Sequence, residues 1–500
     1  MYIENKLSRK DMLHCVLCGN APCDGVCERN LNPAKLLRHL WFANEAFAAA
    51  NLPAELPCVN CAAPCEKACL KTGEVPIKKI LCRLATEVKP CLDTPVSQDE
   101  AALKTELCGI PLENPFLLSS SVVASTYDMC ARAFEAGWAG AAFKTICAFD
   151  IHEASPRFSA IHSANGDIVG FKNIEQLSDH GVAENMDIFC RLKKNYPHKF
   201  LLASIMGRND AEWGELAHLC QENGADAIEL NFSCPNMMED GLGSDIGQIP
   251  ELVERFTAAT KRGTTLPVLA KLTPNVARMS PAAVAAKRGG ADGLAAINTI
   301  KSIVGVNPHT YVSSPAVKGG SAVGGYSGNA VKPIALRFIA ELGQNPGLSG
   351  MHISGMGGVE TWRDALEFLL LGAGSIQVTT AVMQYGYRII DDLKSGLNYY
   401  LRDKGFSQVG EIVGLGLDTV SESTEAIARD SIVYPKFLRK NCLGCGRCEI
   451  SCADGGHQAI RLNEKRQPIL DPKRCVGCHL CLLVCPAGAI VSSGRRVACS

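Results

Sequence analysis

The chain has 500 residues, of which 47% are hydrophobic and 20% are charged, and its formal net charge at pH 7 is -1. This length predicts about three domains, and the balanced charge argues against binding to nucleic acid or to an anionic membrane. The longest apolar runs, such as residues 368–373, are far shorter than the ~18 residues that a membrane-spanning helix needs. Residues 1–10 are charged and lack the apolar segment of a secretory signal. We therefore expect a cytoplasmic protein.

The cysteines are unevenly distributed along the chain. Of 25 cysteines, ten lie between Cys15 and Cys91, six between Cys108 and Cys234, and nine between Cys442 and Cys499. In a cytosolic chain of this length such clustering indicates metal ligation rather than disulfides. We therefore expect a cysteine-rich helical domain over residues 1–100, a central domain over 101–435 and a second cysteine-rich domain over 436–500.

The N-terminal domain combines helical patterns at residues 33–50 and 77–88 with two runs of cysteines. The first run is Cys15-x2-Cys18-x4-Cys23-x3-Cys27, and the second comprises Cys58, Cys61, Cys65, Cys69 and Cys82. This spacing fits either iron–sulfur clusters or zinc, and we favour clusters.

The central domain alternates short apolar runs with helical patterns. The apolar runs occupy residues 116–118, 139–143, 201–205, 227–231, 268–272, 293–298, 351–354 and 375–378. Helical patterns between them include residues 211–222, 250–261, 281–288, 332–341 and 360–371. Eight strands that alternate with helices predict a (β/α)8 TIM barrel. A doubly wound sheet is the alternative, but its glycine-rich turn should follow the first strand, and residues 119–125 contain no glycine.

The C-terminal domain repeats the pattern C-x2-C-x2-C-x3-C. In such a pair the fourth cysteine of each run ligates the cluster of the other run. The expected ligand sets are Cys442, Cys445, Cys448 and Cys485 for one [4Fe-4S] cluster, and Cys475, Cys478, Cys481 and Cys452 for the other. Zinc is the alternative, and the doubled pattern followed by Pro486 disfavours it. The domain resembles bacterial two-cluster ferredoxins over its whole length.

The N-terminal domain resembles the helical iron–sulfur domain of dihydropyrimidine dehydrogenase in residues 15–29, 65–69, 76–77 and 85–88. The resemblance implies that Cys15, Cys18, Cys23 and Cys69 hold one cluster and that Cys27, Cys61 and Cys65 hold three corners of another. The family's fourth ligand to that cluster is a glutamine, and Cys82 lies within one residue of its place. Cys58 and Cys91 are then ordinary thiols.

The central domain resembles the dihydroorotate and dihydropyrimidine dehydrogenase superfamily, most closely its pyrimidine-reducing branch. The motifs that carry the resemblance are residues 114–115, 143–145, 173–175, 228–236, 270–275, 291–293, 298–299, 324–328, 333–337 and 357–359. The resemblance implies FMN bound by Ser120, Lys144, Thr145, Lys271, Asn298, Gly328, Gly357, Gly358, Thr379 and Thr380. It implies a small cyclic substrate bound by Asn173, Asn231, Asn298 and Thr299.

These residue types suit those roles. Lysines at strand ends, as expected for Lys144 and Lys271, supply positive charge that stabilises a reduced flavin; salt-bridged structural lysines are the alternative. Gly355–Gly358 and Thr379-Thr380 follow the seventh and eighth strands, where barrels commonly bind phosphate. Asparagine amides match the alternating C=O and N–H groups of a pyrimidine, although isolated asparagines are more often turn residues.

One expected residue is missing. The resemblance implies a cysteine general acid on the loop after the fourth strand, and residues 236–248 contain no cysteine. Ile246 occupies the aligned position, so we expect either that Ser244 or Asp245 takes the role or that the chain does not reduce uracil or thymine by that mechanism. We interpret Cys234, at the strand end, as a packed structural thiol.

The resulting hypothesis is an oxidoreductase subunit that carries FMN and four [4Fe-4S] clusters and acts on a ring C=C of a pyrimidine-like substrate. No G-x-G-x-x-G motif follows a strand, so we expect electrons from an FAD/NAD(P)H-binding flavoprotein subunit or another redox carrier, as in the bacterial members of this family. A homo-oligomer is compatible with the family. The alternatives are an FMN reductase or dehydrogenase for a different N-heterocycle, and a non-catalytic electron-transfer subunit of a larger redox complex.

Overall fold

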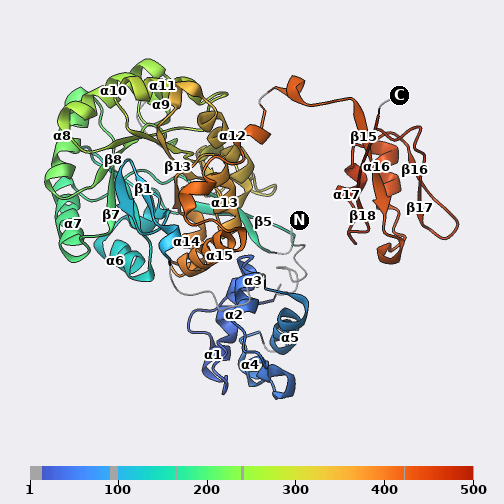
Figure 1. Ribbon diagram of the computed structural model, residues 1–500. Helices are drawn as coiled ribbons and strands as arrows, with labels where there is room; N and C mark the ends of the chain where they lie inside the picture. Colours follow the sequence, from blue (N-terminus) through green and yellow to red (C-terminus); the bar gives the residue numbers. More distant parts are fainter. Residues whose placement is uncertain are drawn as a thin grey trace. The chain divides into compact units, whose positions relative to one another are not determined.

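The computed structural model describes residues 14–71, 73–90, 100–164, 166–237, 241–421 and 423–498. The chain divides into two compact units, and the boundary in the sequence lies between Val420 and Ser421. The first unit contains an N-terminal helical region and the central barrel, and the second contains the C-terminal cysteines (Figure 1). Within the described residues no helix combines the length and apolar character needed to cross a membrane.

The central domain is a closed barrel of parallel strands, as predicted. Its strands are β3 (Phe116–Leu118), β4 (Gly140–Ile146), β7 (Phe200–Ile205), β8 (Ala227–Asn231), β9 (Val268–Lys271), β10 (Gly293–Ala296), β13 (His352–Met356) and β14 (Ser375–Val378). Each strand pairs with the next in chain order, and β14 pairs with β3 to close the barrel. The closure excludes the doubly wound sheet. Nearly every residue of these strands is buried, which explains why they appear in the sequence as apolar runs rather than as an alternating pattern.

Helices cover the outside of the barrel. They are α6 (Tyr127–Ala136), α7 (Val182–Asn195), α8 (Asp210–Glu222), α10 (Pro250–Gly263), α11 (Ser280–Arg288), α12 (Lys332–Gly343), α13 (Trp362–Leu370), α14 (Thr380–Tyr385) and α15 (Ile389–Lys404). Several begin at a side-chain cap: Asn209 accepts from two backbone N–H groups at the start of α8, and Thr361 forms a capping box with Asp364 at the start of α13.

A short hairpin closes the amino-terminal end of the barrel. Strands β1 (Thr105–Leu107) and β2 (Ile110–Leu112) pair antiparallel, and Leu107 and Leu112 pack against Leu117, Phe200 and Leu269 of the barrel strands. This apolar plug fills the amino-terminal end of the barrel and leaves the carboxyl end for the functional site.

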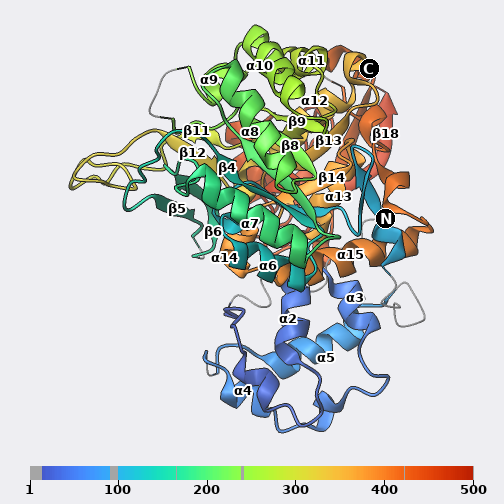
Figure 2. The ribbon, with the colours of Figure 1, turned by 90° about the vertical axis from the view of Figure 1, so that its left-hand side faces the viewer.

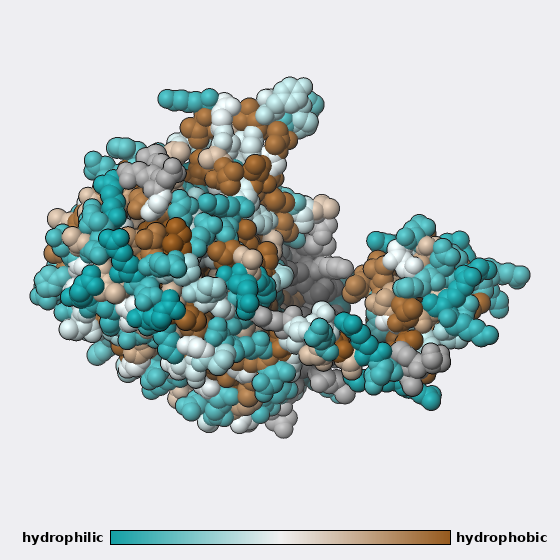
Figure 3. Space-filling model, turned by 90° about the horizontal axis from the view of Figure 1, so that it is seen from above, coloured by the Kyte–Doolittle hydropathy of each residue, from teal (hydrophilic) through white to brown (hydrophobic). Residues whose placement is uncertain are grey.

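A second sheet, which the sequence did not predict, lies beside the carboxyl end of the barrel. It has the order β11 (Ile300–Ser302), β12 (Gly324–Ser327), β6 (Ile168–Asn173) and β5 (Phe158–His162). Residues 303–323, between β11 and β12, form an arm that projects from the barrel (Figure 2). Figure 3 shows hydrophobic residues on this projection, and the arm exposes Ile303, Val306, Tyr311 and Val323.

The N-terminal region is helical, with α1 (Pro22–Gly25), α2 (Pro33–Trp41), α3 (Glu45–Ala50), the 3-10 turn η2 (Pro57–Asn60), α4 (Pro64–Ala68) and α5 (Ile77–Glu87). The prediction of a single helix over residues 33–50 is wrong, because the helix is interrupted between α2 and α3. Ala43 adopts a left-handed φ of 56° there, and its carbonyl accepts a hydrogen bond of 2.8 Å from Trp362 Nε1 of the barrel. Docking onto the barrel thus overrides local helix propensity.

The second unit has the fold expected for a two-cluster ferredoxin. Its long strands, β15 (Ser431–Phe437) and β18 (Ile490–Ala498), pair antiparallel, and β15 starts before residue 436, where we expected this domain to begin. The helices α16 (Arg447–Gly455) and α17 (Leu480–Leu483) and the hairpin of β16 (Ile460–Leu462) and β17 (Pro468–Leu470) complete the unit.

Candidate functional site

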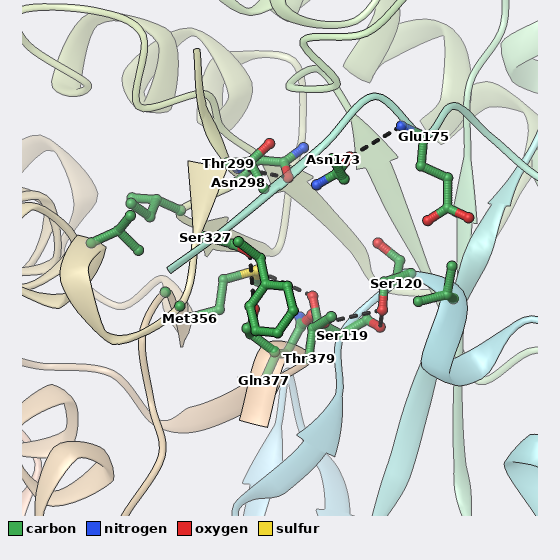
Figure 4. A pocket seen from close by; sticks show the side chains of 18 of the residues that line it. Ser119, Ser120, Asn173, Glu175, Asn298, Thr299, Ser327, Met356, Gln377 and Thr379 are labelled. Carbon is green, nitrogen blue, oxygen red and sulfur yellow. Dashed lines mark hydrogen bonds between the residues drawn. The ribbon is translucent and has the colours of Figure 1, made fainter. Parts of the chain in front are cut away.

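One pocket opens at the carboxyl ends of the barrel strands. Every residue predicted to bind the flavin or to orient the substrate lines it: Ser120, Lys144, Thr145, Asn173, Asn231, Lys271, Asn298, Thr299, Gly328, Gly357, Gly358, Thr379 and Thr380. In Figure 4, Asn173, Asn298 and Thr299 lie on one side of the pocket and Ser119, Gln377 and Thr379 on the other. The fold therefore brings together the predicted residues, which are spread over some 260 positions between Ser120 and Thr380 of the sequence.

The closed end of the pocket holds a buried ion pair. Lys271 Nζ lies 3.3 Å from Glu229 Oε1, and it donates a hydrogen bond of 2.7 Å to Ser120 Oγ. Ser120 Oγ in turn donates to Glu229 Oε1 at 2.7 Å, and Gln377 Nε2 donates to Glu229 Oε2 at 3.2 Å. Sequence reasoning missed Glu229 and Gln377. The available signal for Glu229 was a lone acidic residue inside an otherwise apolar strand, because such a residue requires a buried partner.

The second predicted lysine is also paired. Lys144 Nζ lies 3.2 Å from Glu175 Oε1 and 3.6 Å from Glu153 Oε1. Burial raises the pKa of Glu153, although Lys144 and Arg157 act in the opposite direction. Lys144 does not end its strand, since β4 continues to Ile146, and the register of β4 against β7 shifts between Phe143 and Ile146. Such an irregularity re-aims side chains, and here it accompanies the entry of Lys144 and Thr145 into the pocket.

The predicted substrate asparagines belong to hydrogen-bond networks. Asn231 Nδ2 donates to Thr145 Oγ1 at 2.8 Å, while Asn231 Oδ1 accepts from Ser233 Oγ at 3.0 Å. Asn298 Nδ2 donates to the same Ser233 hydroxyl at 2.9 Å. These bonds fix the amide planes at the strand ends, so the remaining donors and acceptors face the pocket in set orientations.

A residue of the loop after β8 fixes the side chain of Asn173, which lies on β6. Asn236 Nδ2 donates to Asn173 Oδ1 at 3.0 Å and to the carbonyl of Glu175 at 2.7 Å. Asn236 Oδ1 is buried and has no hydrogen-bond partner among the described residues. An unpaired buried acceptor in a pocket wall indicates that a ligand or water supplies the missing donor.

Glycines form a narrow cradle on the other side of the pocket. Gly358 has a φ of 85°, and a Cβ there would lie 2.9 Å from the carbonyl oxygen of Gly328 and 2.9 Å from the backbone nitrogen of Lys332. Gly357 has a φ of 119°, and its Cβ would lie 2.9 Å from Ile297. Thr379 Oγ1 lies 3.1 Å from Ser121 Oγ, and Thr380 Oγ1 donates to Ser327 Oγ at 3.0 Å. Exposed backbone and hydroxyl groups converge here, which suits a phosphate.

The thiol in the pocket is Cys234. It lines the pocket, whereas Ser244, Asp245 and Ile246 are absent from its described lining residues. Ser244 is 2% exposed, and its backbone N–H donates to the carbonyl of Cys234 at 2.9 Å. Burial raises the pKa of Cys234 to about 11, despite the opposing hydrogen bond from the Asn236 backbone. Of these four residues, Cys234 is the one that lines the described part of the pocket. Residues 238–240 of this loop lie outside the described residues.

The C-terminal cysteines surround two separate cavities in the second unit. Cys442, Cys445, Cys448 and Cys485 line one, and Cys452, Cys475, Cys478 and Cys481 line the other. Each cavity combines three cysteines from one run with the fourth cysteine of the other run, as expected from the spacing.

The first N-terminal group of thiols also shares a cavity. Cys15, Cys18, Cys23 and Cys69 line it together with Arg388, a residue of the barrel domain. Burial, followed by Asp24, Cys15 and Cys69, raises the pKa of Cys23 to about 11. In the described part of the chain no three His, Cys, Asp or Glu side chains are arranged for a single metal ion. Wider thiol sets of this kind suit a cluster, whose irons lie between the ligands.

The second N-terminal group holds one thiol more than a cubane needs. Burial, followed by the neighbouring thiols of Cys82, Cys61, Cys65 and Cys27, raises the pKa of Cys58 to about 11. Cys58 lies on η2, which packs against α5, the helix that carries Cys82. Cys58, expected to be an ordinary thiol, therefore lies within this group. Cys91 lies outside the described residues.

Comparisons with known proteins place the barrel and the second unit in families. Residues 102–401 match the family model for dihydroorotate dehydrogenase, and residues 437–492 match the model for a 4Fe-4S dicluster domain. A crystal structure of DHODH from Eimeria tenella in complex with ferulenol superposes with a TM-score of 0.54 at 18% identity, covering 64% of this chain and 90% of that one. At this identity the likeness supports the fold alone.

Two relatives are more similar in sequence. The chain is 54% identical over 389 residues to the NAD-dependent dihydropyrimidine dehydrogenase subunit PreA of Escherichia coli (strain K12), across 78% of this chain and 94% of the relative. It is 36% identical over 345 residues to the chloroplastic dihydropyrimidine dehydrogenase (NADP(+)) of Arabidopsis thaliana, across 67% of this chain and 81% of the relative. Together with the closed barrel, these matches show that the chain belongs to the dihydroorotate dehydrogenase family of flavoprotein oxidoreductases, in a form that carries a C-terminal 4Fe-4S dicluster domain.

Proposed function

We propose that the chain is the FMN- and iron–sulfur-carrying subunit of a dihydropyrimidine dehydrogenase. The E. coli relative, at 54% identity over nearly its whole length, carries that name and supports the assignment. The observation in the structure that carries it is the pocket at the carboxyl ends of the barrel strands, where a protonated thiol, a set of fixed amides and a phosphate cradle face one another.

The pocket residues fit FMN. The cradle of Gly328, Gly357, Gly358, Thr379 and Thr380 suits the phosphate, because its glycines let the surrounding backbone segments approach one another closely and present their N–H groups. Gln377 Oε1 is buried and without a partner among the described residues, so it offers an acceptor to a ring N–H. Lys271 and Ser120 lie at the same end of the pocket as Gln377. When bound, FMN supplies hydride transfer, and the clusters supply single electrons.

Reduction of a pyrimidine C=C adds a hydride to one ring carbon and a proton to its neighbour. Cys234 donates the proton in this proposal, because it lines the pocket and its thiol is protonated at neutral pH. The resulting thiolate recovers its proton from solvent, and in the reverse direction it accepts the proton. Asn173, Asn231, Asn298 and Thr299 orient the ring through its alternating C=O and N–H groups.

Four [4Fe-4S] clusters complete the proposal. Two belong to the second unit, with the ligand sets that line its two cavities. Two belong to the proposed N-terminal domain of residues 1–100, the first held by Cys15, Cys18, Cys23 and Cys69 and the second by Cys27, Cys61, Cys65 and a thiol from Cys82 or Cys58. A separate FAD/NAD(P)H-binding flavoprotein subunit exchanges electrons with these clusters, since the relative is named as one subunit of an NAD-dependent enzyme.

A spectral titration under anaerobic conditions tests the proposal. The purified chain, reconstituted with FMN, iron and sulfide, is titrated with uracil, thymine, a purine and a hydantoin, and turnover is measured with dihydrouracil and an artificial one-electron acceptor. We expect uracil or thymine to perturb the flavin spectrum and dihydrouracil to reduce the acceptor. Perturbation and turnover with the hydantoin or purine alone would assign the site to a different N-heterocycle. Clusters without any ligand-induced flavin change would indicate an electron-transfer subunit.

A further inference from the structure

The N-terminal helical region is anchored to the barrel by buried polar contacts. Asp392, on α15, is 1% exposed; its Oδ2 accepts from Arg38 Nε at 2.7 Å, and its Oδ1 lies 2.7 Å from His39 Nδ1. Arg363 Nη2 of α13 lies 3.0 Å from Glu45 Oε1. Figures 1 and 2 both show α2 and α3 against the part of the barrel's outer layer that α14 and α15 form. This interface brings a barrel residue into contact with the first cysteine run.

That residue is Arg388, which lies between α14 and α15. Its Nη1 donates a hydrogen bond of 3.0 Å to the carbonyl of Cys18, and its Nη2 donates to the carbonyl of Leu17. Its Nε donates to the carbonyl of Tyr385 at 3.2 Å, which fixes the guanidinium to the end of α14. The side chain also lines the cavity surrounded by the four thiols of the first N-terminal group.

Arg388 forms no ion pair within the described residues, and its hydrogen bonds go to backbone carbonyls, although the carboxylates of Asp24 and Asp391 also line the cavity. The other cations that line the cavity are in different situations. Arg38 pairs with Asp391 and Asp392, and Lys71 pairs with Glu74. Lys35 is exposed, so water screens its charge. Arg388 is thus the cation best placed to act on a group held by these thiols.

We propose that Arg388 positions the first N-terminal cluster and raises its reduction potential, an inference that rests on the proposed [4Fe-4S] site of Cys15, Cys18, Cys23 and Cys69. A cubane with four thiolates is anionic and gains a further negative charge when it accepts one electron from the partner subunit. A fixed positive charge beside it therefore stabilises the reduced form more than the oxidised form. The two hydrogen bonds hold the ligand-bearing loop in place.

The experiment is a redox titration of the full-length chain under anaerobic conditions, followed by electron paramagnetic resonance. Cys69→Ala identifies the signal of this cluster, because that variant loses it. We expect Arg388→Gln to lower the cluster's midpoint potential by about 59 mV, which is a tenfold change in the one-electron equilibrium. Arg388→Lys, which keeps the charge, should retain most of the wild-type potential. Lys35→Gln is the matched control and should leave the potential unchanged.

Two results would overturn the inference. One is an unchanged potential in Arg388→Gln with full iron and sulfide content. The other is loss of the signal in both Arg388→Gln and Arg388→Lys, which would make Arg388 a structural clamp without an electrostatic effect. Failure of the underlying cluster assignment looks different, because the wild-type chain itself would then contain no signal that Cys69→Ala removes.

Discussion

Lys271 and Glu229 form an ion pair of 3.3 Å at the closed end of the pocket, although their exposed fractions are only 2% and 0%. Ser120 bridges them, since it accepts from Lys271 and donates to the same Glu229 oxygen. The pair is therefore neutral before any flavin charge develops. Glu229 thus limits how much positive charge Lys271 offers to the proposed flavin.

The first prediction follows from this balance. Replacing Glu229 with Gln keeps the shape of the side chain but leaves Lys271 with an uncompensated positive charge. We expect the midpoint potential of bound FMN to rise, because the reduced flavin carries more negative charge than the oxidised form, and we expect the apoprotein to lose stability, since breaking a buried pair costs about 3–5 kcal/mol. Spectroelectrochemistry and thermal denaturation measure the two effects.

Glu175→Gln is the matched control for that variant. Lys144 keeps a second carboxylate 3.6 Å away in Glu153 when Glu175 is neutralised, so its charge remains partly balanced. The shift in flavin potential should be smaller than for Glu229→Gln. A flavin potential that falls in Glu229→Gln would contradict the proposed balance.

The second prediction concerns Cys234. Its replacement by Ala removes the proposed proton donor and should reduce turnover of the pyrimidine by about 10²–10⁴-fold, with FMN content unchanged. Cys234→Ser retains a hydroxyl and should keep part of the activity, whereas Ser244→Ala and Asp245→Asn should keep nearly all of it. Steady-state assays with FMN quantified in each variant measure this. Activity that survives in Cys234→Ala and disappears in Asp245→Asn would show that Asp245, and not Cys234, is the proton donor.

The pH dependence of the wild-type chain provides the third prediction. Because burial raises the pKa of Cys234 to about 11, the protonated form that donates should persist well above the ordinary thiol pKa of about 8.5. The rate of ring reduction should therefore not fall between pH 7.5 and 9.5 through loss of this proton. A stopped-flow measurement of flavin oxidation by uracil isolates this step. A descending limb near pH 8.5 that is absent in Cys234→Ser would show that the Cys234 thiol titrates at its ordinary pKa and would contradict the raised value.

The proton donor proposed here, Cys234, could not be located from residue spacing alone. The barrel strands were predictable because both faces of each strand are buried, which makes them continuous apolar runs. The loop after β8 has no such pattern, and counting positions along it led to Ile246, which is buried outside the described pocket lining. The direction of a side chain at a strand end, as for Cys234, depends on the turn that follows and cannot be derived from residue spacing.

The sheet of β5, β6, β11 and β12 was missed for a related reason. Its strands are short, and most of their residues are neither fully buried nor regularly alternating, so they have no distinct period. The cysteine patterns were more informative, since thiols that share a cavity recur at fixed spacing. Cys58 is the exception, because its place beside Cys82 depends on how η2 packs against α5.

The fourth prediction uses two glycines with nearly the same φ. Gly358 has a φ of 85° and Gly386 a φ of 82°, but a Cβ at Gly358 would lie 2.9 Å from backbone atoms, whereas at Gly386 nothing lies within 4 Å. Alanine is strained at either position because φ is positive at both, at a cost of about 1–3 kcal/mol. We expect only Gly358→Ala to lower FMN affinity, by tenfold or more, measured by fluorescence titration of the apoprotein. Equal affinities in the two variants would place the phosphate elsewhere.

The fifth prediction concerns the surplus thiol. Cys58 and Cys82 both lie beside the group of Cys27, Cys61 and Cys65, and a cubane has four corners, so either thiol suffices as the fourth ligand. We expect Cys58→Ala and Cys82→Ala each to retain the second N-terminal cluster, and the double variant to lose an iron from it and show a three-iron signal in electron paramagnetic resonance. Cys190→Ala, at an exposed thiol on α7, is the control for a cysteine remote from the group. Loss of the four-iron signal in Cys82→Ala alone would show that Cys82 is required and that Cys58 cannot replace it, since a nearby thiol ligates only if its Sγ can reach the vacant iron.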